Sequence, residues 1–391
     1  MTAIVAGHIC LDIIPQLPDI GREAFSRAFT PGRLVECGPV ALSTGGAVSN
    51  VGLALHRLGI STQLMGKIGA DLFGQAVRQV VEAHGAGLAD GMIVDPTAGT
   101  SYTVIINPPQ VDRIFLHYAG SNDTFAAADV HDDVVTSARL FHFGYPPLMR
   151  RMYLDDGAEL AALLQRVRSR RVTTSLDMTF PDPAAPAGRA DWRTILRRSL
   201  PFVDIFLPSI EEILFMLRRP DYEALHDRYG ADLLQGITPD LLSDVAAELL
   251  ALGARIVGLK LGERGFYLRT AGQAALADAG RAAPADPSAW ADRELWAPCF
   301  QVTVVGTTGA GDATIAGFLA GLLRGLGPTQ ALTAAVAVGA CNVEAADALS
   351  GIRPWDETLR RVAAGWPRRE LSLDATGWRH DADQQLWVRE R

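Results

Sequence analysis

The residue of this 391-residue chain whose type and position most clearly suggest a role in a reaction is Asp312, a carboxylate that comes directly after Gly309, Ala310 and Gly311. Because an apolar pattern typical of a helix continues towards residue 323, the small-residue turn is expected at a helix N-terminus. Unpaired N–H groups and the helix dipole bind an anion such as a phosphate there. A carboxylate beside it can accept the proton of an attacking hydroxyl, as the base of a phosphotransferase does.

The residues before this turn predict how it is held. A β-branched run over 302–305 stops at Gly306, so the sequence predicts a strand, then a tight turn that includes Thr308, and then the helix. A purely structural alternative is that Thr308 and Asp312 cap the helix and that the glycines allow close packing. This stretch alone leaves the two interpretations open.

A second group of polar residues lies near the N-terminus. Asp12 is a lone carboxylate in a strand-like apolar segment, where burial is costly unless it has partners. Further along, Gly45 and Gly46 precede a predicted helix, and Asn50 lies one turn into it, where its amide can both donate to and accept from a hydroxyl. The alternatives are a surface acid on the outward face of a strand and a solvated helix residue.

Three motifs, in matching order and spacing, resemble the ribokinase-like, or PfkB, family of carbohydrate kinases. Residues 307–322, TTGAGDATIAGFLAGL, resemble the family's C-terminal signature, residues 45–59 its N-terminal signature, and residues 66–74 the G-x-x-G-x-D-x-x-G stretch that follows. The resemblance covers about residues 1–360. It implies that Asp312 is the base beside an anion-binding turn. The residues that it assigns to the sugar are Asp12, Gly45, Gly46 and Asn50.

The same resemblance implies a nucleotide site and a metal site. Asp177 resembles the acid of the family's D-x-N, with Thr179 in the asparagine position, and Ser209 takes the place of the asparagine in P-N-x-x-E. Glu212 matches the glutamate of that motif and is expected to act on Mg²⁺ through water. An acid in the first turn of a helix is also favoured by the helix dipole alone. The other residues assigned to the nucleotide are Lys260, Gly262, Gly265 and Thr308.

Short apolar runs alternate with helical segments through the middle of the chain and predict the fold class. The runs are residues 141–145, 172–177, 203–207 and 256–260. Alternation of this kind predicts an α/β fold in which helices cover both faces of a parallel sheet and ligands bind at the carboxyl ends of the strands. The resemblance makes it a ribokinase-like three-layer sandwich with a central, mostly parallel sheet and a small β-sheet lid.

Two regions outside the alternating series are expected to form the lid. Residues 13–44 are interrupted by Pro and Gly but contain strand-like pieces such as 33–37, and residues 98–120 predict a hairpin. In the family such pieces cover the sugar and are sometimes shared between subunits, which implies a homodimer through the lid as one arrangement. We expect residues 1–366 to form the kinase domain and 367–391 a C-terminal extension.

Two further segments lack the alternating pattern. Residues 270–298 are rich in Ala, Asp, Gly and Pro, and they predict a long, partly mobile insertion near the nucleotide side. Residues 218–240 predict another insertion. A helix of small residues is expected over 328–346, which the family packs against the adenine.

The composition bounds the class of protein. A hydrophobic content of 48% is ordinary for a soluble globular chain, and a net charge of −8 argues against nucleic acid or an acidic membrane as the main partner, since both need a basic surface. The four cysteines stand singly, without the spacing of a zinc finger or of a disulfide framework. A cytoplasmic protein is therefore expected.

Together these features predict an enzyme that transfers the γ-phosphoryl group of ATP, with Mg²⁺, to a hydroxyl of a small sugar or sugar derivative. Two alternatives stay open: a nucleoside kinase of the same fold, and a sugar- or nucleotide-binding regulator without turnover. Gly306, Thr179 and Ser209 depart from the family pattern and favour the second. Gly306 replaces an acid that helps many relatives to hold a monovalent cation, so activation by potassium is doubtful here.

Overall fold

A large twisted sheet forms the centre of the computed structural model, which describes residues 2–18, 31–32, 34–107, 114–373 and 375–390. The sheet has eleven strands in the order β14-β15-β13-β12-β11-β10-β9-β8-β1-β4-β5. Their bounds are β1 Ala3–Gly7, β4 Thr62–Gly69, β5 Ile93–Asp95, β8 Leu140–Gly144, β9 Thr173–Leu176, β10 Ile205–Phe206, β11 Ile256–Lys260, β12 Phe266–Thr270, β13 Glu294–Ala297, β14 Trp378–Asp381 and β15 Leu386–Arg389.

The direction of the strands locates the ligand-binding edge of the sheet. From β5 to β11 neighbouring strands are parallel, and from β11 to β14 they are antiparallel. After β1 the chain first adds β4 and β5 on one side and then returns to β8 on the other side. Ligands of open α/β sheets bind at such a reversal, outside the carboxyl ends of the strands, which here are the ends of β1 and β8.

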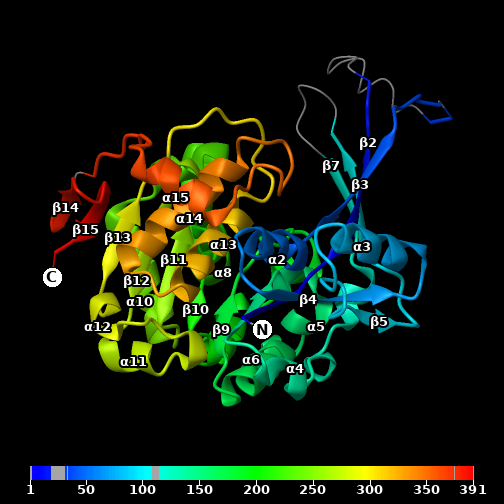
Figure 1. Cartoon of the computed structure of the whole chain (residues 1–391), viewed down its shortest axis with the longest axis horizontal. Helices are drawn as coiled ribbons and strands as arrows, with labels where there is room; N and C mark the ends of the chain where they lie inside the picture. The colour runs from blue at the N-terminus through cyan, green and yellow to red at the C-terminus, as the bar shows by residue number, and fades with distance from the viewer. Residues whose placement is uncertain (1, 19–30, 33, 108–113, 374, 391) are drawn as a thin grey trace.

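Helices cover both faces of the sheet and create two buried cores, so the predicted three-layer sandwich is confirmed (Figure 1). Among the helices of eight or more residues, those with side chains in the first core are α2 Ala47–Arg57, α3 Leu72–Glu82, α13 Ala310–Leu323, α14 Pro328–Asn342 and α15 Trp355–Ala363. Those with side chains in the second core are α6 Ala158–Ser169, α7 Trp192–Ser199, α8 Ile210–Leu217 and α10 Pro239–Ala251.

Small residues allow α13 and α14 to pack closely. A Cβ at Gly317 of α13 would lie 2.8 Å from the carbonyl oxygen of Ala334 in α14, so only glycine fits there. The expected helix over 328–346 ends at Asn342, four residues early. This close pair holds the N-terminus of α13 in a fixed place at the carboxyl edge of the sheet.

A separate four-stranded sheet, in the order β3-β2-β6-β7, forms the predicted lid and projects from the body (Figure 1). Its strands are β2 Cys10–Pro15, β3 Val40–Gly45, β6 Tyr102–Ile106 and β7 Ile114–Tyr118. The predicted hairpin is confirmed, because β6 and β7 pair antiparallel; residues 108–113 between them lie outside the described part of the chain.

One strand of the lid differs from the prediction. The piece expected at 33–37 is wrong: Arg33 is not described and residues 34–37 form no strand. The partner of β2 is instead β3, in a register that pairs Pro15 with Val40 and Cys10 with Gly45. Gly38 and Pro39 separate the β-like residues from this pairing. Strand propensity alone therefore predicted the strand before these two residues, whereas it lies after them.

The segment 270–298 is built from regular elements and is not the irregular insertion that was predicted, although its last residues, Ala297 and Pro298, lie against Gly265. It forms α11 Gln273–Ala277, α12 Pro287–Trp290 and β13 of the large sheet, and Trp290 and Trp296 are 1% and 0% exposed. Ala282 N–H donates to Thr173 Oγ at the start of β9, which places this part at the opposite edge of the sheet. Single buried tryptophans between small residues produce no periodicity to detect.

The other two irregular segments are also ordered where they are described. Residues 218–240 include α9 Arg219–Tyr229 and a 3₁₀ turn that precedes α10. Residues 367–391, expected as an extension, contribute β14 and β15, and β15 pairs with β13 to lengthen the large sheet (Figure 1).

Candidate active site

The turn before Asp312 forms a helix N-terminus, as the sequence predicts, but without a strand before it. Gly309 is the N-cap of α13, with a φ of 71° that favours glycine. Residues 302–305 form no strand, and the side chains of Val304 and Val305 are 52% and 60% exposed. They pair with no strand in the part of the chain that the structure describes, and Val305 N–H donates instead to the Val343 carbonyl at the end of α14.

Asp312 is buried and accepts hydrogen bonds from two distant parts of the chain. Asn50 Nδ2 of α2 donates to Oδ2 at 3.0 Å, and the Tyr145 hydroxyl lies 2.8 Å from both carboxylate oxygens. Asn50 belongs to the N-terminal motif, so this bond joins the two signature motifs at one point. The oxygen of the Asn50 amide, Oδ1, has no partner among the described residues and remains available to a ligand.

Tyr145 is a site residue that the sequence analysis missed. It follows β8 directly, at the reversal of strand order, and has a φ of 65°, a conformation that is uncommon for a residue other than glycine. The available signal was its place at the carboxyl end of a predicted parallel strand, but the apolar run around it concealed the polar role of the hydroxyl.

Burial sets the proton affinity of Asp312. Loss of solvent raises the pKa of its carboxyl above the ordinary value, and the nearby charge of Glu212 raises this pKa further. Lys260 and the hydrogen bonds from Tyr145 and Asn50 act in the opposite direction and lower it. A carboxylate with a raised pKa is a stronger proton acceptor, while its hydrogen bonds fix its orientation.

Three acids and one lysine meet at the polar end of the site. Lys260 Nζ donates to Asp177 Oδ1 at 2.6 Å, and Asp177 is fully buried. Burial raises the pKa of Asp177, an effect that Lys260 opposes and that Glu212 and Asp312 increase. Burial opposes the charge on Lys260, but the three neighbouring carboxylates raise its pKa overall. The group carries more acidic than basic side chains, which suits a cation.

The helix that follows β10 holds the two residues taken from the P-N-x-x-E resemblance. Ser209 is the N-cap of α8: its Oγ accepts from Glu212 N–H at 3.2 Å, and Glu212 Oε2 accepts from Ser209 N–H at 2.7 Å. This reciprocal capping box explains both residue types locally. Both also line the pocket described next, so the capping and ligand-binding interpretations are compatible.

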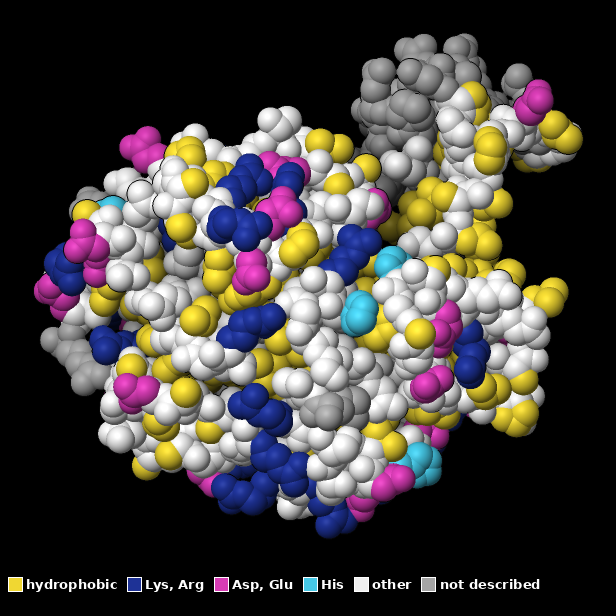
Figure 2. Space-filling view, in the orientation of Figure 1, with side chains coloured by type: hydrophobic (Ala, Val, Ile, Leu, Met, Phe, Trp, Pro, Cys, Tyr) yellow, Lys and Arg dark blue, Asp and Glu magenta, His cyan; other side chains and the backbone are white. Residues whose placement is uncertain are grey.

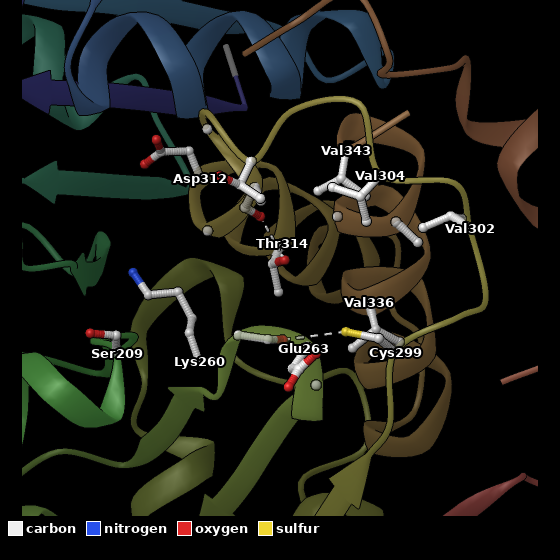
Figure 3. Close-up of a pocket in the computed structure, with 18 of the residues that line it drawn as sticks. Ser209, Lys260, Glu263, Cys299, Val302, Val304, Asp312, Thr314, Val336 and Val343 are labelled. Atoms are coloured by element: carbon white, nitrogen blue, oxygen red, sulfur yellow. Dashed lines mark hydrogen bonds between the residues drawn. The ribbon is translucent and has the colours of Figure 1, made fainter. Parts of the chain in front are cut away.

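A pocket of about 460 Å³ extends from Asp312 to an apolar end between the loop before α13 and helix α14. Figure 3 shows Lys260 and Asp312 at its polar end and a group of valines with Cys299 at the other. The valines are Val302, Val304, Val336 and Val343. A cavity with a charged end for the phosphates and an apolar end for the base fits a nucleoside triphosphate.

Of the other residues predicted for the nucleotide site, some line the pocket and others do not. Gly262 and Gly265 line the pocket, and Gly265 has a φ of 100° in the tight turn between β11 and β12. Thr307 lines the pocket, whereas Thr308 is not among its lining residues. Arg264, next to Gly265, donates to the carbonyls of Leu234 and Ile237 and therefore has a structural role.

A second missed residue comes from the C-terminal segment. Arg369 lines the pocket and donates to Glu263 Oε2 at 2.9 Å, and its own N–H donates to the Cys299 carbonyl. The position lies beyond all recognised motifs, so no local pattern pointed to it.

The residues assigned to the sugar lie where the lid joins the body. Gly45 is required beside Asp12, because a Cβ at Gly45 would lie 2.5 Å from the Asp12 carboxylate. Gly46 begins α2 with a φ of 90°, and a Cβ there would lie 2.4 Å from His8 Nδ1. Burial raises the pKa of Asp12 to about 6. A half-buried carboxylate, two glycines and Asn50 thus form one cradle, which we call the acceptor cradle.

Comparison with known proteins shows the family of the chain. The family model described as pfkB family carbohydrate kinase matches residues 5–355, so the chain belongs to this family and is a carbohydrate kinase. An uncharacterized sugar kinase of Archaeoglobus fulgidus is 27% identical over 273 residues, which are 70% of this chain and 87% of that protein. Fructokinase-2 of Oryza sativa subsp. japonica is 24% identical over 325 residues, 81% of this chain and 79% of its own.

Solved structures show the same fold. The ribokinase of Arabidopsis thaliana, complexed with ribose and ATP, matches with a TM-score of 0.67 and 18% identity over 92% of this chain and 97% of that one. An E. coli structure with ATP and Mg²⁺ matches with a TM-score of 0.65 and 18% identity over 93% and 99% of the two chains. The predicted ribokinase-like fold is therefore confirmed. Among the described residues, the helices are all too short or too polar to span a bilayer.

Proposed function

We propose that the protein transfers the γ-phosphoryl group of ATP to a hydroxyl of a small sugar held in the acceptor cradle, with Asp312 as the base. The observation that carries this proposal is the hydrogen bond from Asn50 to Asp312. It joins the cradle to the N-terminus of α13, at the polar end of a pocket with an apolar far end. The two substrates would therefore meet at Asp312.

The geometry supports a division of tasks among the residues around the transferred group. Asp312 accepts the proton of the acceptor hydroxyl at a carboxylate oxygen, while Tyr145 and Asn50 hold that carboxylate in place. The amides at Gly309, Ala310 and Gly311 and the dipole of α13 stabilise the negative charge on the phosphoryl oxygens. Phosphoryl transfer passes through a loose transition state, so positioning and electrostatics supply most of the acceleration.

The acidic residues near Lys260 fit Mg²⁺, which prefers oxygen ligands and retains several waters. Asp177 Oδ2 is buried without a partner among the described residues, and Glu212 lines the same pocket. We assign these two side chains to the ion, Glu212 through water. When bound, Mg²⁺ would neutralise charge on the β- and γ-phosphates.

We propose that the lid covers a small acceptor and that it also takes part in assembly. Its outer strands expose apolar side chains, among them Leu42, Phe115 and Leu116 at 49%, 55% and 54%, and Figure 2 shows hydrophobic residues along this projection. We propose that a second copy of the chain covers this surface. Sedimentation of the purified protein should give a dimer, and a monomer at all concentrations would contradict this assignment.

The experiment that tests the function is a substrate panel. ATP and Mg²⁺ are incubated with fructose, ribose, other sugars, sugar acids and nucleosides, and both ADP and the phosphorylated product are measured. We expect a phosphorylated sugar. Turnover with nucleosides alone would identify the nucleoside kinase instead, and no ADP above the acceptor-free control with any compound would favour a regulator without turnover.

A further inference from the structure

Three metal-ligating side chains gather at the base of the lid. His8, in the link between β1 and β2, Cys10 at the start of β2, and His117 in β7 each offer one ligand atom, and these atoms lie within 4.8 Å of one another. None of them has a task in the phosphoryl transfer proposed above.

His8 is the strongest sign that this cluster takes a ligand. Its side chain is 2% exposed, and neither ring nitrogen has a hydrogen-bond partner among the described residues. Leaving such a group buried and unpaired is costly, so an unmade contact at this place needs an explanation. Its ring centroid is 5.3 Å from that of His117.

Neighbouring groups hold the other two side chains in position. Thr103 Oγ lies 3.0 Å from His117 Nδ1 and donates to Cys10 Sγ at 3.5 Å. An outer contact of this kind on one ring nitrogen fixes the orientation of a metal-binding histidine. The Cys10 thiol in turn donates to Asp12 Oδ1 at 3.4 Å. Ligand distances for zinc give an S···O separation of about 3.5 Å across a tetrahedral ion.

We propose that His8, Cys10 and His117 form a binding site for Zn²⁺ or a similar transition-metal ion, with a fourth position next to Asp12. Nitrogen and sulfur ligands select such ions and disfavour Mg²⁺, so this site is chemically separate from the acidic group near Lys260. The ion takes the thiolate, and the thiol proton is released to solvent.

A bound ion would connect the lid to the body of the protein. His117 belongs to an outer strand of the lid, whereas His8 follows β1 of the large sheet and its ring lies 6.2 Å from that of Tyr145. His8 also lies against Gly46, and Cys10 against Asp12. The ion therefore occupies one side of the acceptor cradle. A consequence that rests on the proposed function is that Zn²⁺ competes with the sugar and not with ATP.

Binding is tested on the full-length protein without ATP or sugar, so the result does not depend on the proposed function. Co²⁺ serves as the spectroscopic probe, and we expect a thiolate-to-cobalt charge-transfer band with the intense visible bands of a tetrahedral site, saturating at one ion per chain. Zn²⁺ should abolish both sets of bands. Calorimetry with Zn²⁺ should give the same stoichiometry.

Matched variants decide where the ion binds. Cys10→Ser should lose the charge-transfer band, and His117→Ala, at an exposed lid position that leaves the core intact, should weaken Zn²⁺ affinity at least about tenfold, as loss of one ligand or its support does. Cys37→Ser removes an exposed lid cysteine outside the cluster and should change nothing. A charge-transfer band that survives in Cys10→Ser, or the absence of any band in the unmodified protein, would overturn the proposal.

Discussion

The two ends of the site are built in different ways. The nucleotide end combines the anion-binding turn at Gly309–Gly311 and the glycine turn after β11 with apolar side chains, and its lining residues range from Tyr145 to Arg369. The sugar end comes from one short part of the chain: the side chains of Asp12 in lid strand β2 and Asn50 in α2, with Gly45 and Gly46 between them. The first depends on close backbone approach, and the second on a few individual side chains.

This difference separates what the family shares from what one member can change. A binding surface of backbone groups tolerates no added side chain, whatever its chemistry. A cradle of side chains can accept another hydroxyl pattern after one or two substitutions, because each contact is made by a separate residue. We therefore expect mutations at the nucleotide end to abolish turnover with every sugar, and mutations at the sugar end to change which sugar is used.

The largest effect is expected from Gly311→Val. The three atoms nearest to a Cβ at Gly311 all belong to Lys260, at 3.4 Å or more, so there is room for a side chain, but the valine would occupy the anion-binding turn. Turnover should fall by up to about 10³-fold, the upper range for loss of an anion-stabilising donor, with an unchanged melting temperature. Gly272→Val, at the start of α11, is the matched control and should retain activity. Normal turnover in Gly311→Val would show that the glycine serves packing alone.

Asp12→Ala tests the sugar end of the comparison. It removes hydrogen bonds to an acceptor hydroxyl, and contacts with a charged group contribute about 1.5–3 kcal/mol, so the sugar KM should rise roughly tenfold or more. The ATP KM should stay constant. Because burial raises the pKa of Asp12 to about 6, the assay is run above that pH. If calorimetry showed a weaker affinity for ATP and an unchanged one for sugar, the two ends would have to be exchanged.

Tyr145→Phe gives a smaller effect, visible in the pH profile. The hydroxyl stabilises the ionised form of Asp312 and so lowers a pKa that burial raises. Without it the pKa of Asp312 rises further, and the acidic limb of kcat, where the base becomes protonated, should move to higher pH. Tyr153→Phe, a tyrosine that does not contact Asp312, should leave the profile unchanged. An unshifted acidic limb in Tyr145→Phe would show that Tyr145 does not influence the pKa of Asp312.

The smallest effect concerns potassium. Gly306 offers no carboxylate, and backbone oxygens alone carry only partial charge, so replacing sodium by potassium at fixed ionic strength should change the rate less than about twofold. Gly306→Asp is not a simple gain-of-function test: Gly306 does not have a positive φ, but its Cβ would lie 2.9 Å from the Ala345 and Ala346 carbonyl oxygens and would displace them. Strong, saturable activation of the unmodified protein would contradict the expectation.

The sequence was sufficient to predict those parts of the structure that a local residue pattern determines. Alternation of apolar runs predicted the parallel sheet, and the small-residue turn predicted the start of α13 at Ala310. The motifs also pointed to Asn50 and Asp312 separately. Their direct hydrogen bond spans 262 positions of the chain, which no single motif could show, and only the fold placed them together.

The failures have a common physical cause, which is that a tertiary partner decided the outcome. Residues 302–305 have β propensity but no adjacent strand, so they remain a loop. Residues 270–298 look irregular, yet β13 joins the sheet because β12 offers it a free edge. Tyr145 and Arg369 carry no motif, and their contribution comes only from where neighbouring elements place them.

The most direct test of the central claim is a single-turnover measurement on Asp312→Asn. The substitution keeps the size and most hydrogen bonds of the side chain but removes its ability to accept a proton. With ATP affinity measured in parallel by calorimetry, we expect a chemical step slower by at least about 10²-fold and an almost unchanged affinity for ATP. A chemical step as fast as that of the unmodified protein would show that Asp312 is not the base.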